Sequence, residues 1–461
     1  MKKSFLLTVA LMLSLLIIAT FSFASRKKEA VKEVEAVEEA EEFDWKKYDG
    51  NEVNLFMVEH PYAAGIINAI PEFTKLTGIA VSVESLSENE FFDKLSILLS
   101  AGNTELDVFM SGVMQLWTYA PAGYVEPLDD YINNPSMTNP DYDFEDIFPR
   151  LREATQWSMV PGEPVGNGPQ LALPIGFEQM ALSYRADLFE KYNIEVPETL
   201  ADVYEAAKII EENEPDMYGF STRGIRTWNL CHTAPISLLT NYGGTDFDEN
   251  LQPAMGSPEG IEFHKDFVKL IQDHGRPGWV GTEWYDVMGD LASGKTAMTI
   301  DADILGFYAQ QQEGAVISEP GMINWAPVPT KPGGTDHKAN LWVWSIAMNA
   351  ASDSKGPAWY FMQWATSKEY DERFALNLSR LNPVRASTWE NEEFTENLKA
   401  SCPTYTDTFL YTIDYCSVLF TPQKEMVERV TKWAIAIQEM VEGADVEERL
   451  EELVEDLTLE E

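Results

Sequence analysis

The sequence predicts an α/β protein with a mostly parallel sheet covered by helices, and three observations support this prediction. Strand-like and helix-like patterns alternate three times within about 60 residues at the start of the globular part. The chain of 461 residues is long enough for two or three domains at roughly 150 residues each. Its content of 45% hydrophobic residues can fill proper cores, so disorder is excluded for the bulk of the chain.

The first strands and helices are predicted between residues 53 and 110. Short apolar runs bounded by polar residues are typical of buried parallel strands. The three strands predicted in this way are Val53 to Val58, Ile79 to Val83 and Leu106 to Met110. The two segments between them carry apolar residues at helical spacing, and these helices are expected to end by Gly78 and Gly102.

Further along the chain, helix ends are marked by capping residues. Thr199 and Asp202 have the spacing of a capping box. Ser257 and Pro258 predict the start of a helix that runs to Gly275. A long amphipathic helix is expected to end at Gly443. The acidic tail after it is interpreted as a packed surface helix, because its apolar residues keep helical spacing at Leu450, Leu453, Val454 and Leu457.

Residues 1–24 have the pattern of a signal peptide. A positive start at Lys2 and Lys3 precedes an apolar run from Phe5 to Ile18, and Ser22 to Ala24 forms a small-x-small cleavage site. A membrane anchor is the alternative, but it needs about 20 apolar residues. We therefore expect an exported protein, periplasmic or extracellular, without a lipid-bearing cysteine and with a charged linker over 25–51.

The charge excludes several kinds of partner. With 33 Lys and Arg against 76 Asp and Glu, the formal net charge is -43, which repels nucleic acids and anionic lipids. Only 3 cysteines are present, without a CxxC spacing, so neither a disulfide scaffold nor a zinc site is indicated. In an oxidising compartment Cys402 and Cys416 can pair and leave Cys231 free, or all three can be buried thiols.

Several segments occur in an order that resembles a known family. They include "FTKLTGI" before residue 80, "LDVFMSG" at 106–112, "LALPIGFEQMALSYRADLFEKYNIEVPETLADVYEAAKII" at 171–210, "LASGKTAMTID", "INWAPVPTKPGG", "WSIAMNAASDSKGPAWYFMQWATS" at 344–367 and "LNPVRAS" at 381–387. Together they resemble bacterial extracellular solute-binding protein family 1, the sugar-binding proteins of ABC importers, in the branch of maltose-binding protein.

The resemblance implies the type II periplasmic-binding-protein fold, with two α/β lobes joined by a hinge and a ligand cleft between them. Lobe one is then expected to comprise 52–174 plus 345–367, and lobe two 175–344 plus 368–461. A sugar or polyol holds the closed form, which docks on a membrane permease. The resemblance implies a monomer that is not an enzyme and uses no cofactor or metal.

Sugar hydroxyls need carboxylate or amide partners and sugar C–H faces suit aromatic rings, which directs the choice of site residues. The candidates are Glu59, His60, Ser111, Glu178, Trp284, Asp301, Asp303, Trp342 and Arg385. Glu178 stands where maltose-binding protein has a ligand-contacting Glu, although a surface or hinge salt bridge is an alternative role. Glu59, His60 and Ser111 follow predicted strands, at the edge where open α/β sheets bind ligands.

The remaining candidates leave alternatives open. Trp284 can line the cleft or pack in a core, and Arg385 can bind a ligand or form a salt bridge between lobes. Asp301 and Asp303 follow a strand-like segment that lacks the aromatic of maltose-binding protein, so a long maltodextrin site is not implied. Trp342 and Trp344 are two residues apart at the second crossover, and one can face the cleft while the other faces the core of a lobe; Trp342 is favoured for the cleft because Trp344 leads into an apolar run.

Two other functions remain in view at this point. A secreted carbohydrate-active enzyme needs a carboxylate pair about 5 to 10 Å apart, which counting acids cannot reveal. No GxSxG, HExxH or P-loop motif is present. The same fold can also bind a cationic solute such as a polyamine, because Asp, Glu and Trp suit cations.

Overall fold

A mixed sheet is the frame of the protein in the computed structural model, which describes residues 42–377 and 381–458. The strands within these residues are β1 Glu52–Val58, β2 Ala80–Leu86, β3 Val108–Ser111, β4 Leu173–Arg185, β5 Tyr218–Ser221, β6 Thr296–Ala302, β7 Ile323–Ala326, β8 Ala339–Met348 and β9 Cys416–Ser417. They follow the order β2-β1-β3-β8-β4-β6-β5, with β7 paired to β4 and β9 to β8. The predicted signal peptide and residues 25–41 of the predicted linker lie outside the described residues.

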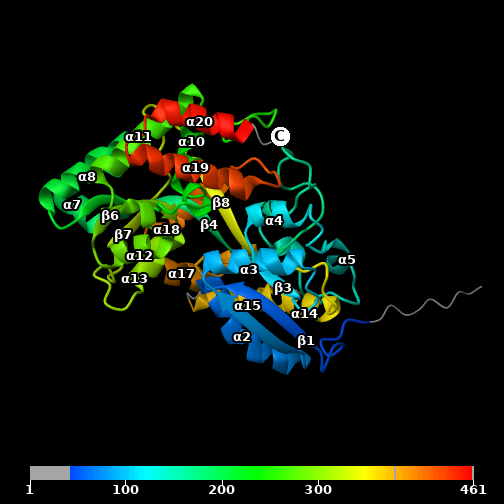
Figure 1. The fold of residues 1–461 in the computed structure, drawn as a ribbon. Coiled ribbons are helices and arrows are strands. Elements are labelled where there is room, and N and C mark those ends of the chain that lie inside the picture. The colour runs from blue at the N-terminus through cyan, green and yellow to red at the C-terminus, as the bar shows by residue number, and fades with distance from the viewer. Residues whose placement is uncertain (1–41, 378–380, 459–461) are drawn as a thin grey trace, which may run out of the picture.

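The α-helices cover the sheet on both faces (Figure 1). They are α2 Pro61–Thr77, α3 Glu88–Ser100, α4 Val113–Tyr119, α5 Asp129–Ile132, α6 Pro149–Ala154, α7 Ala186–Tyr192, α8 Leu200–Asn213, α9 Trp228–Cys231, α10 Ala234–Tyr242, α11 Pro258–His274, α12 Trp284–Ala292, α13 Ile304–Gln310, α14 Lys355–Ala365, α15 Lys368–Leu376, α16 Ala386–Trp389, α17 Glu392–Ser401, α18 Tyr405–Tyr415, α19 Met426–Val441 and α20 Val446–Thr458. No helix of the described residues combines the length and the apolar character needed to cross a bilayer.

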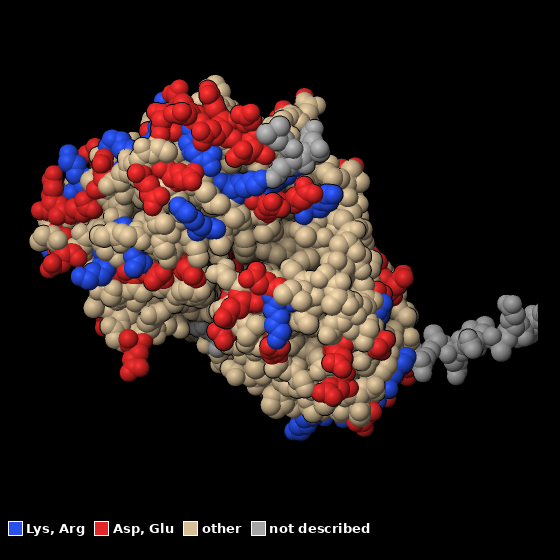
Figure 2. All heavy atoms as spheres, viewed as in Figure 1, with Lys and Arg blue, Asp and Glu red and all other residues tan. Residues whose placement is uncertain are grey.

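The predicted caps and periodicities correspond to real helix ends. Gly78 closes α2 in the left-handed conformation, at a φ of 76°. Thr199 and Asp202 form the predicted capping box of α8, and Ser257 caps α11. The acidic tail forms the predicted helix α20, which buries Leu450, Leu453 and Leu457. Figure 2 shows that acidic side chains gather on the exposed side of this helix.

The sheet is less parallel than predicted. The pairs β1–β2, β1–β3 and β5–β6 are parallel, but β4 runs antiparallel to β6, β7 and β8, and β8 runs antiparallel to β3. The physical reason is that β4 and β8 are crossing strands that connect the two ends of the sheet, whereas the βα repeats which led to the prediction cover only its first part.

The crossing strands join two groups of elements. The first part of β4 pairs with β8, and from Met180 onward β4 pairs with β6 and β7. Figure 1 shows β1 and β3 with α2, α3 and α14 at one end of the molecule, and β6 and β7 with α7, α8 and α11 at the other. The crossing strands are buried along their whole length, so the two groups share a continuous core there.

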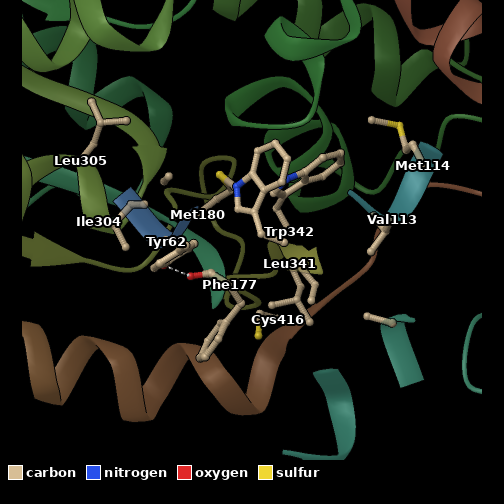
Figure 3. Close-up of a cluster of buried hydrophobic side chains, with 14 of the residues drawn as sticks. Tyr62, Val113, Met114, Phe177, Met180, Ile304, Leu305, Leu341, Trp342 and Cys416 are labelled. Carbon is tan, nitrogen blue, oxygen red and sulfur yellow. Dashed lines mark hydrogen bonds between the residues drawn. The ribbon is translucent and has the colours of Figure 1, made fainter. Parts of the chain in front are cut away.

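Two glycines allow close packing at this crossing. A Cβ on Gly176 would lie 2.4 Å from the ring of Tyr62, and a Cβ on Gly112 would lie 2.1 Å from the indole of Trp342. The Tyr62 hydroxyl donates a 2.8 Å hydrogen bond to the carbonyl of Phe177, as the buried cluster in Figure 3 shows. These contacts bring the start of α2 and the residue before α4 directly against the crossing strands.

The segment after the second crossing packs on the first group of elements. Arg373 on α15 pairs with Glu72 on α2, and Lys368 pairs with Asp143. Arg385 is fully buried and its guanidinium donates to the carbonyl oxygens of Thr366 and Asp143. The three cysteines are buried free thiols, which answers the question left open by the sequence.

Candidate functional site

A small cavity lies between the two groups of elements, beside the crossing strands. The empty space between its lining atoms, together with the solvent at its mouth, is about 410 Å³. Its polar lining consists of His60, Glu88, Glu178, Arg223, His232 and Tyr308, and its apolar lining of Pro61, Trp284, Met288, Ala302, Ile304, Leu305 and Trp344. Polar groups with rings and aliphatic side chains around them are the arrangement expected for a small ligand that carries hydroxyls.

Glu178 lies at the floor of the cavity, on β4. The indole Nε1 of Trp344, on the neighbouring β8, donates a 3.0 Å hydrogen bond to Glu178 Oε1. His60 Nε2 lies 3.5 Å from the same oxygen, while His60 Nδ1 accepts the amide of Tyr62 at the start of α2. Both contacts involve Oε1 of Glu178, so its Oε2 is available to accept ligand hydroxyls.

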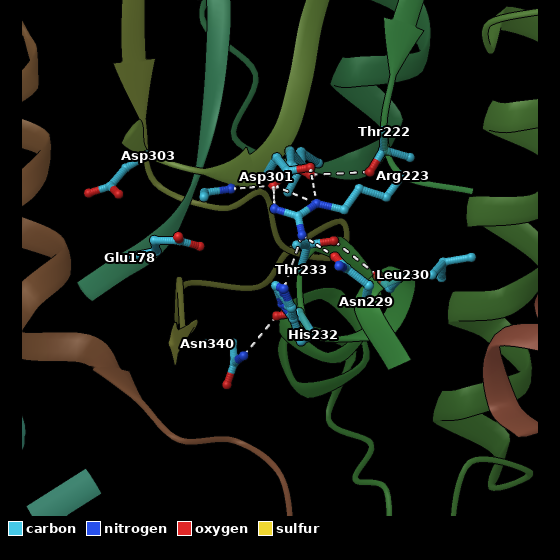
Figure 4. A network of polar contacts seen from close by, with 12 residues as sticks. Glu178, Thr222, Arg223, Asn229, Leu230, His232, Thr233, Asp301, Asp303 and Asn340 are labelled. Atoms are coloured by element: carbon cyan, nitrogen blue, oxygen red, sulfur yellow. Dashed lines mark hydrogen bonds and ion pairs between the residues drawn. The ribbon is translucent and has the colours of Figure 1, made fainter. Parts of the chain in front are cut away.

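Arg223 provides the cationic side of the cavity, from the segment after β5 (Figure 4). Its guanidinium forms a two-pronged contact with Asp301 of β6, at 2.6 Å from Nη2 to Oδ1 and 3.0 Å from Nε to Oδ2. Its Nη1 lies 3.1 Å from Nε2 of His232. Because Asp301 neutralises most of the buried charge, Arg223 is held in one orientation with its edge toward the cavity.

His232 is a neutral imidazole of defined tautomer. Burial, with a smaller contribution from Arg223, lowers the pKa of His232 well below its usual value. A guanidinium only donates, so Nε2 of His232 accepts from Arg223 and its proton is on Nδ1. That Nδ1 has no hydrogen-bond partner among residues 42–377 and 381–458. Nδ1 of His232 is therefore a buried donor without an acceptor among the described residues.

Glu88 is the first residue of α3 and faces the cavity from the opposite group of elements. Its Oε1 accepts a 3.1 Å hydrogen bond from Nδ2 of Asn229, on α9. Burial raises the pKa of Glu88 to about 7; the Glu178 carboxylate acts in the same direction, and Arg223 and Asn229 oppose it. Near neutral pH this carboxyl group is therefore partly protonated and can donate as well as accept.

Three of the predicted site residues line this cavity: His60, Glu178 and Trp284. Asp301 lies one layer behind it, where it holds Arg223. Asp303 belongs to a separate buried network, in which it accepts hydrogen bonds from Tyr405 at 2.7 Å and from Asn382 at 3.0 Å.

The other predicted residues lie away from the cavity lining. Glu59 is exposed to solvent, and the hydroxyl of Ser111 donates to the carbonyl of Gly112. Arg385 is buried in the contacts with Thr366 and Asp143 described above. The sequence favoured Trp342 over Trp344, but the side chain that lines the cavity is Trp344, because Trp342 is covered by its neighbours.

Glu88, Arg223, His232 and Tyr308 line the cavity and were missed from the sequence. Glu88 and Arg223 had a positional signal: each comes within two residues after a strand, β2 and β5 respectively, at the edge where α/β sheets bind ligands. His232 and Tyr308 lie inside segments whose pattern indicates only buried helices, so no local signal distinguishes them from core residues.

Comparisons with known proteins find a matching family and a similar sequence. Residues 59–372 match the family described as "Bacterial extracellular solute-binding protein". The chain is 34% identical over 415 residues to the erythritol/L-threitol-binding protein of Mycolicibacterium smegmatis, covering 89% of this chain and 86% of that protein.

Two solved structures resemble the fold. The first is an ABC transporter solute-binding protein from Agrobacterium vitis S4 with bound D-mannitol, at a TM-score of 0.76 and 23% identity over 89% of this chain and 98% of that one. The second comes from Agrobacterium radiobacter K84 in complex with ribitol, at a TM-score of 0.77 and 20% identity over 89% of this chain and 99% of that one. These likenesses confirm the predicted two-lobed α/β fold.

Proposed function

Since the chain belongs to the bacterial extracellular solute-binding protein family, we propose that its cavity captures a linear polyol of about four to six carbons. Membership of a binding family also answers the enzyme alternative, because such a protein holds its solute and does not transform it. The prediction of a solute-binding protein of the sugar and polyol type is thereby confirmed at the level of the family.

The observation that carries this proposal is the match between the cavity and a short polyhydroxy chain. The empty space of the cavity is small, about 410 Å³ even with the solvent at its mouth included, which leaves no room for an oligosaccharide. A linear polyol has a hydroxyl on every carbon, and the lining offers an acceptor at Glu178 and a donor at Arg223. The indoles of Trp284 and Trp344 provide faces for its C–H groups.

The names of the relatives support the same class of ligand. The protein that is 34% identical is named for two four-carbon polyols, and the two similar structures hold six-carbon and five-carbon polyols. A polyamine fits less well, because the guanidinium of Arg223 lies at the cavity and the pKa of Glu88 is raised, so the lining carries less negative charge than its residues suggest.

We further propose that the two groups of elements are lobes which close on the ligand. The pairing of β4 and β8 supports lobe one as 52–174 plus 345–367 and lobe two as 175–344 plus the C-terminal part. The ion pair between Arg373 and Glu72 favours an extension of lobe one through α15 and α16. Closure has to be driven by the greater affinity of the ligand for the closed form.

Two parts of the proposal rest on the family alone. As an extracellular solute-binding protein, the chain is proposed to act outside the cytoplasm after export through its N-terminal segment. It is proposed to deliver the polyol, as a monomer, to the membrane subunits of an ABC importer.

The test is calorimetric titration of the purified protein with erythritol, L-threitol, ribitol, D-mannitol, maltose and spermidine. We expect binding of one or more of the polyols and none of spermidine. Glu178→Gln should weaken the best polyol by about 10- to 100-fold, since hydrogen bonds to a charged group contribute about 1.5 to 3 kcal/mol. The matched control is Glu59→Gln, which alters an exposed carboxylate at the end of β1. Binding of spermidine without any polyol would overturn the proposal, as would equal affinity in the Glu178 variant.

A further inference from the structure

A layer of aromatic rings closes one end of the cavity. This layer, here called the aromatic partition, consists of Phe92, Trp228, His232, Trp342 and Trp344. The rings of Trp228, Trp342 and His232 are nearly parallel: Trp342 stacks on Trp228 at 4.8 Å and 20°, and on His232 at 4.7 Å and 17°. Phe92 faces Trp344 at 6.4 Å and 12° and meets Trp228 edge-on at 6.0 Å.

The aromatic partition separates two spaces. On the inner side, His232 and Trp344 line the cavity. On the outer side, Phe92 and Trp228 line a groove of about 880 Å³ that is open to solvent. The same layer of rings therefore belongs to both spaces: Trp228, which lines the groove, contacts His232, which lines the cavity, at 5.2 Å between ring centroids.

The outer groove has the chemistry of a site for hydroxyl groups. Apart from its rings it is lined largely by hydroxyl, amide and carboxylate side chains: Asn89, Asp93, Ser96, Gln115, Thr118, Thr227 and Thr431. Gln115 is 3% exposed, and neither its Oε1 nor its Nε2 has a hydrogen-bond partner among residues 42–377 and 381–458. A buried amide without partners costs free energy that a ligand hydroxyl can recover.

The partition is also assembled from both groups of elements. Phe92 comes from α3, whereas Trp228 begins α9, and Trp342 and Trp344 come from the crossing strand β8. The contact between Phe92 and Trp228 therefore forms only when the two groups of elements are together. In the closed form this contact completes the wall at the end of the cavity.

We propose that the aromatic partition sets the length of the ligand, with Trp228 as the specificity-determining residue that excludes ligands longer than about six carbons from the cavity. This inference rests on the proposed function and adds an upper limit to the length of the ligand. Without the indole of Trp228, the cavity and the groove become one longer site, and the amide of Gln115 becomes available to the added hydroxyls.

The test compares erythritol, D-mannitol and the disaccharide alditol maltitol by calorimetry, in the unaltered protein and in Trp228→Ala. The loss of the stacked wall should weaken erythritol up to about tenfold, as expected for an aromatic stack. Maltitol should bind at least about tenfold more tightly than it does to the unaltered protein. Trp228→Phe, which keeps a ring in the wall, should restore the preference for the short polyol.

A matched control separates the length limit from a loss of packing. Trp389→Ala removes a partly buried indole that stacks on a neighbour, Phe409, at 3.8 Å and lies outside the cavity lining. It should lower the melting temperature without changing the ratio of the erythritol and maltitol affinities. If the ratio of the erythritol and maltitol affinities is the same in Trp228→Ala as in the unaltered protein, the length limit alone is overturned. Absence of polyol binding in both proteins would overturn the proposed function and the inference with it.

Discussion

Glu88 should make ligand binding depend on pH, and replacing it with glutamine tests this prediction directly. Its carboxyl is buried between the two groups of elements, and burial raises its pKa from 4.5 to about 7. In an open form the same carboxyl is solvated and has the ordinary value. Closure around a ligand therefore takes up a proton at Glu88. The favourable contribution of this proton to ligand binding is complete below the ordinary pKa of the carboxyl and is lost as the pH rises through about 7.

The size of the effect follows from the two pKa values. From about pH 5 to about pH 8, the dissociation constant of the polyol should rise by about 70-fold, if Glu88 has its ordinary pKa in the open form. At about pH 6, binding should take up about 0.9 proton for each ligand molecule bound. In Glu88→Gln the side chain is neutral throughout and its Oε1 still accepts from Asn229, so this dependence should disappear.

The assay is calorimetric titration in buffers of different ionisation enthalpy, across the same pH range. His60, Glu178, Glu283 and Arg223 also act at or near this site, so the difference between the two proteins isolates Glu88. Glu90→Gln, at an exposed carboxylate on the same turn of α3, should behave like the unaltered protein. A pH slope in Glu88→Gln equal to that of the unaltered protein would refute the reasoning.

Three further predictions concern hydrogen bonds and thiols. Trp344→Phe keeps a ring at the cavity but removes the donor to Glu178, so polyol affinity should fall about tenfold by calorimetry, and unchanged affinity would contradict the role of that bond. Asp303→Ala removes one acceptor from Tyr405 and one from Asn382, which keep Asn382 Oδ1 and the Phe177 carbonyl respectively, so the free energy of unfolding in urea should fall by about 1 to 3 kcal/mol, while an unchanged value would contradict this. The folded protein should react with no thiol reagent and show all 3 thiols when unfolded without reductant; a single reactive thiol would instead reveal a disulfide.

The helices were predictable from the sequence because their signals are local. The capping box of Thr199 and Asp202 lies within one turn, and the cap at Ser257 lies next to the helix that it starts. The amphipathic spacing of Leu450, Leu453 and Leu457 identified the C-terminal helix in the same way. Such features depend on hydrogen bonds and periodicities within a few residues, so they can be interpreted without knowledge of the rest of the chain.

Site residues were predictable only where their place in the sequence, after a predicted strand or in a segment that resembles a known family, indicated a role. Glu178 was found because its segment resembles a crossing strand of a known family, and His60 because it follows a predicted strand. Arg223 is assigned to the site only by its contact with Asp301. The two residues are 78 positions apart along the chain and lie side by side because β5 pairs with β6. A pairing of that kind leaves no periodicity in the sequence.

The sequence by itself determined the class of fold, the helix ends, the family and the acidic surface, all of which follow from local pattern, order of segments and composition. Only the tertiary structure decided which polar groups meet at the cavity and which of two indoles faces it. Trp342 and Trp344 lie on one face of β8 and are equivalent in the sequence. Trp228 and His232 stack on Trp342 and cover it, whereas Trp344 is left to donate to Glu178. The difference lies in what packs against each ring, and those neighbours come from distant parts of the chain.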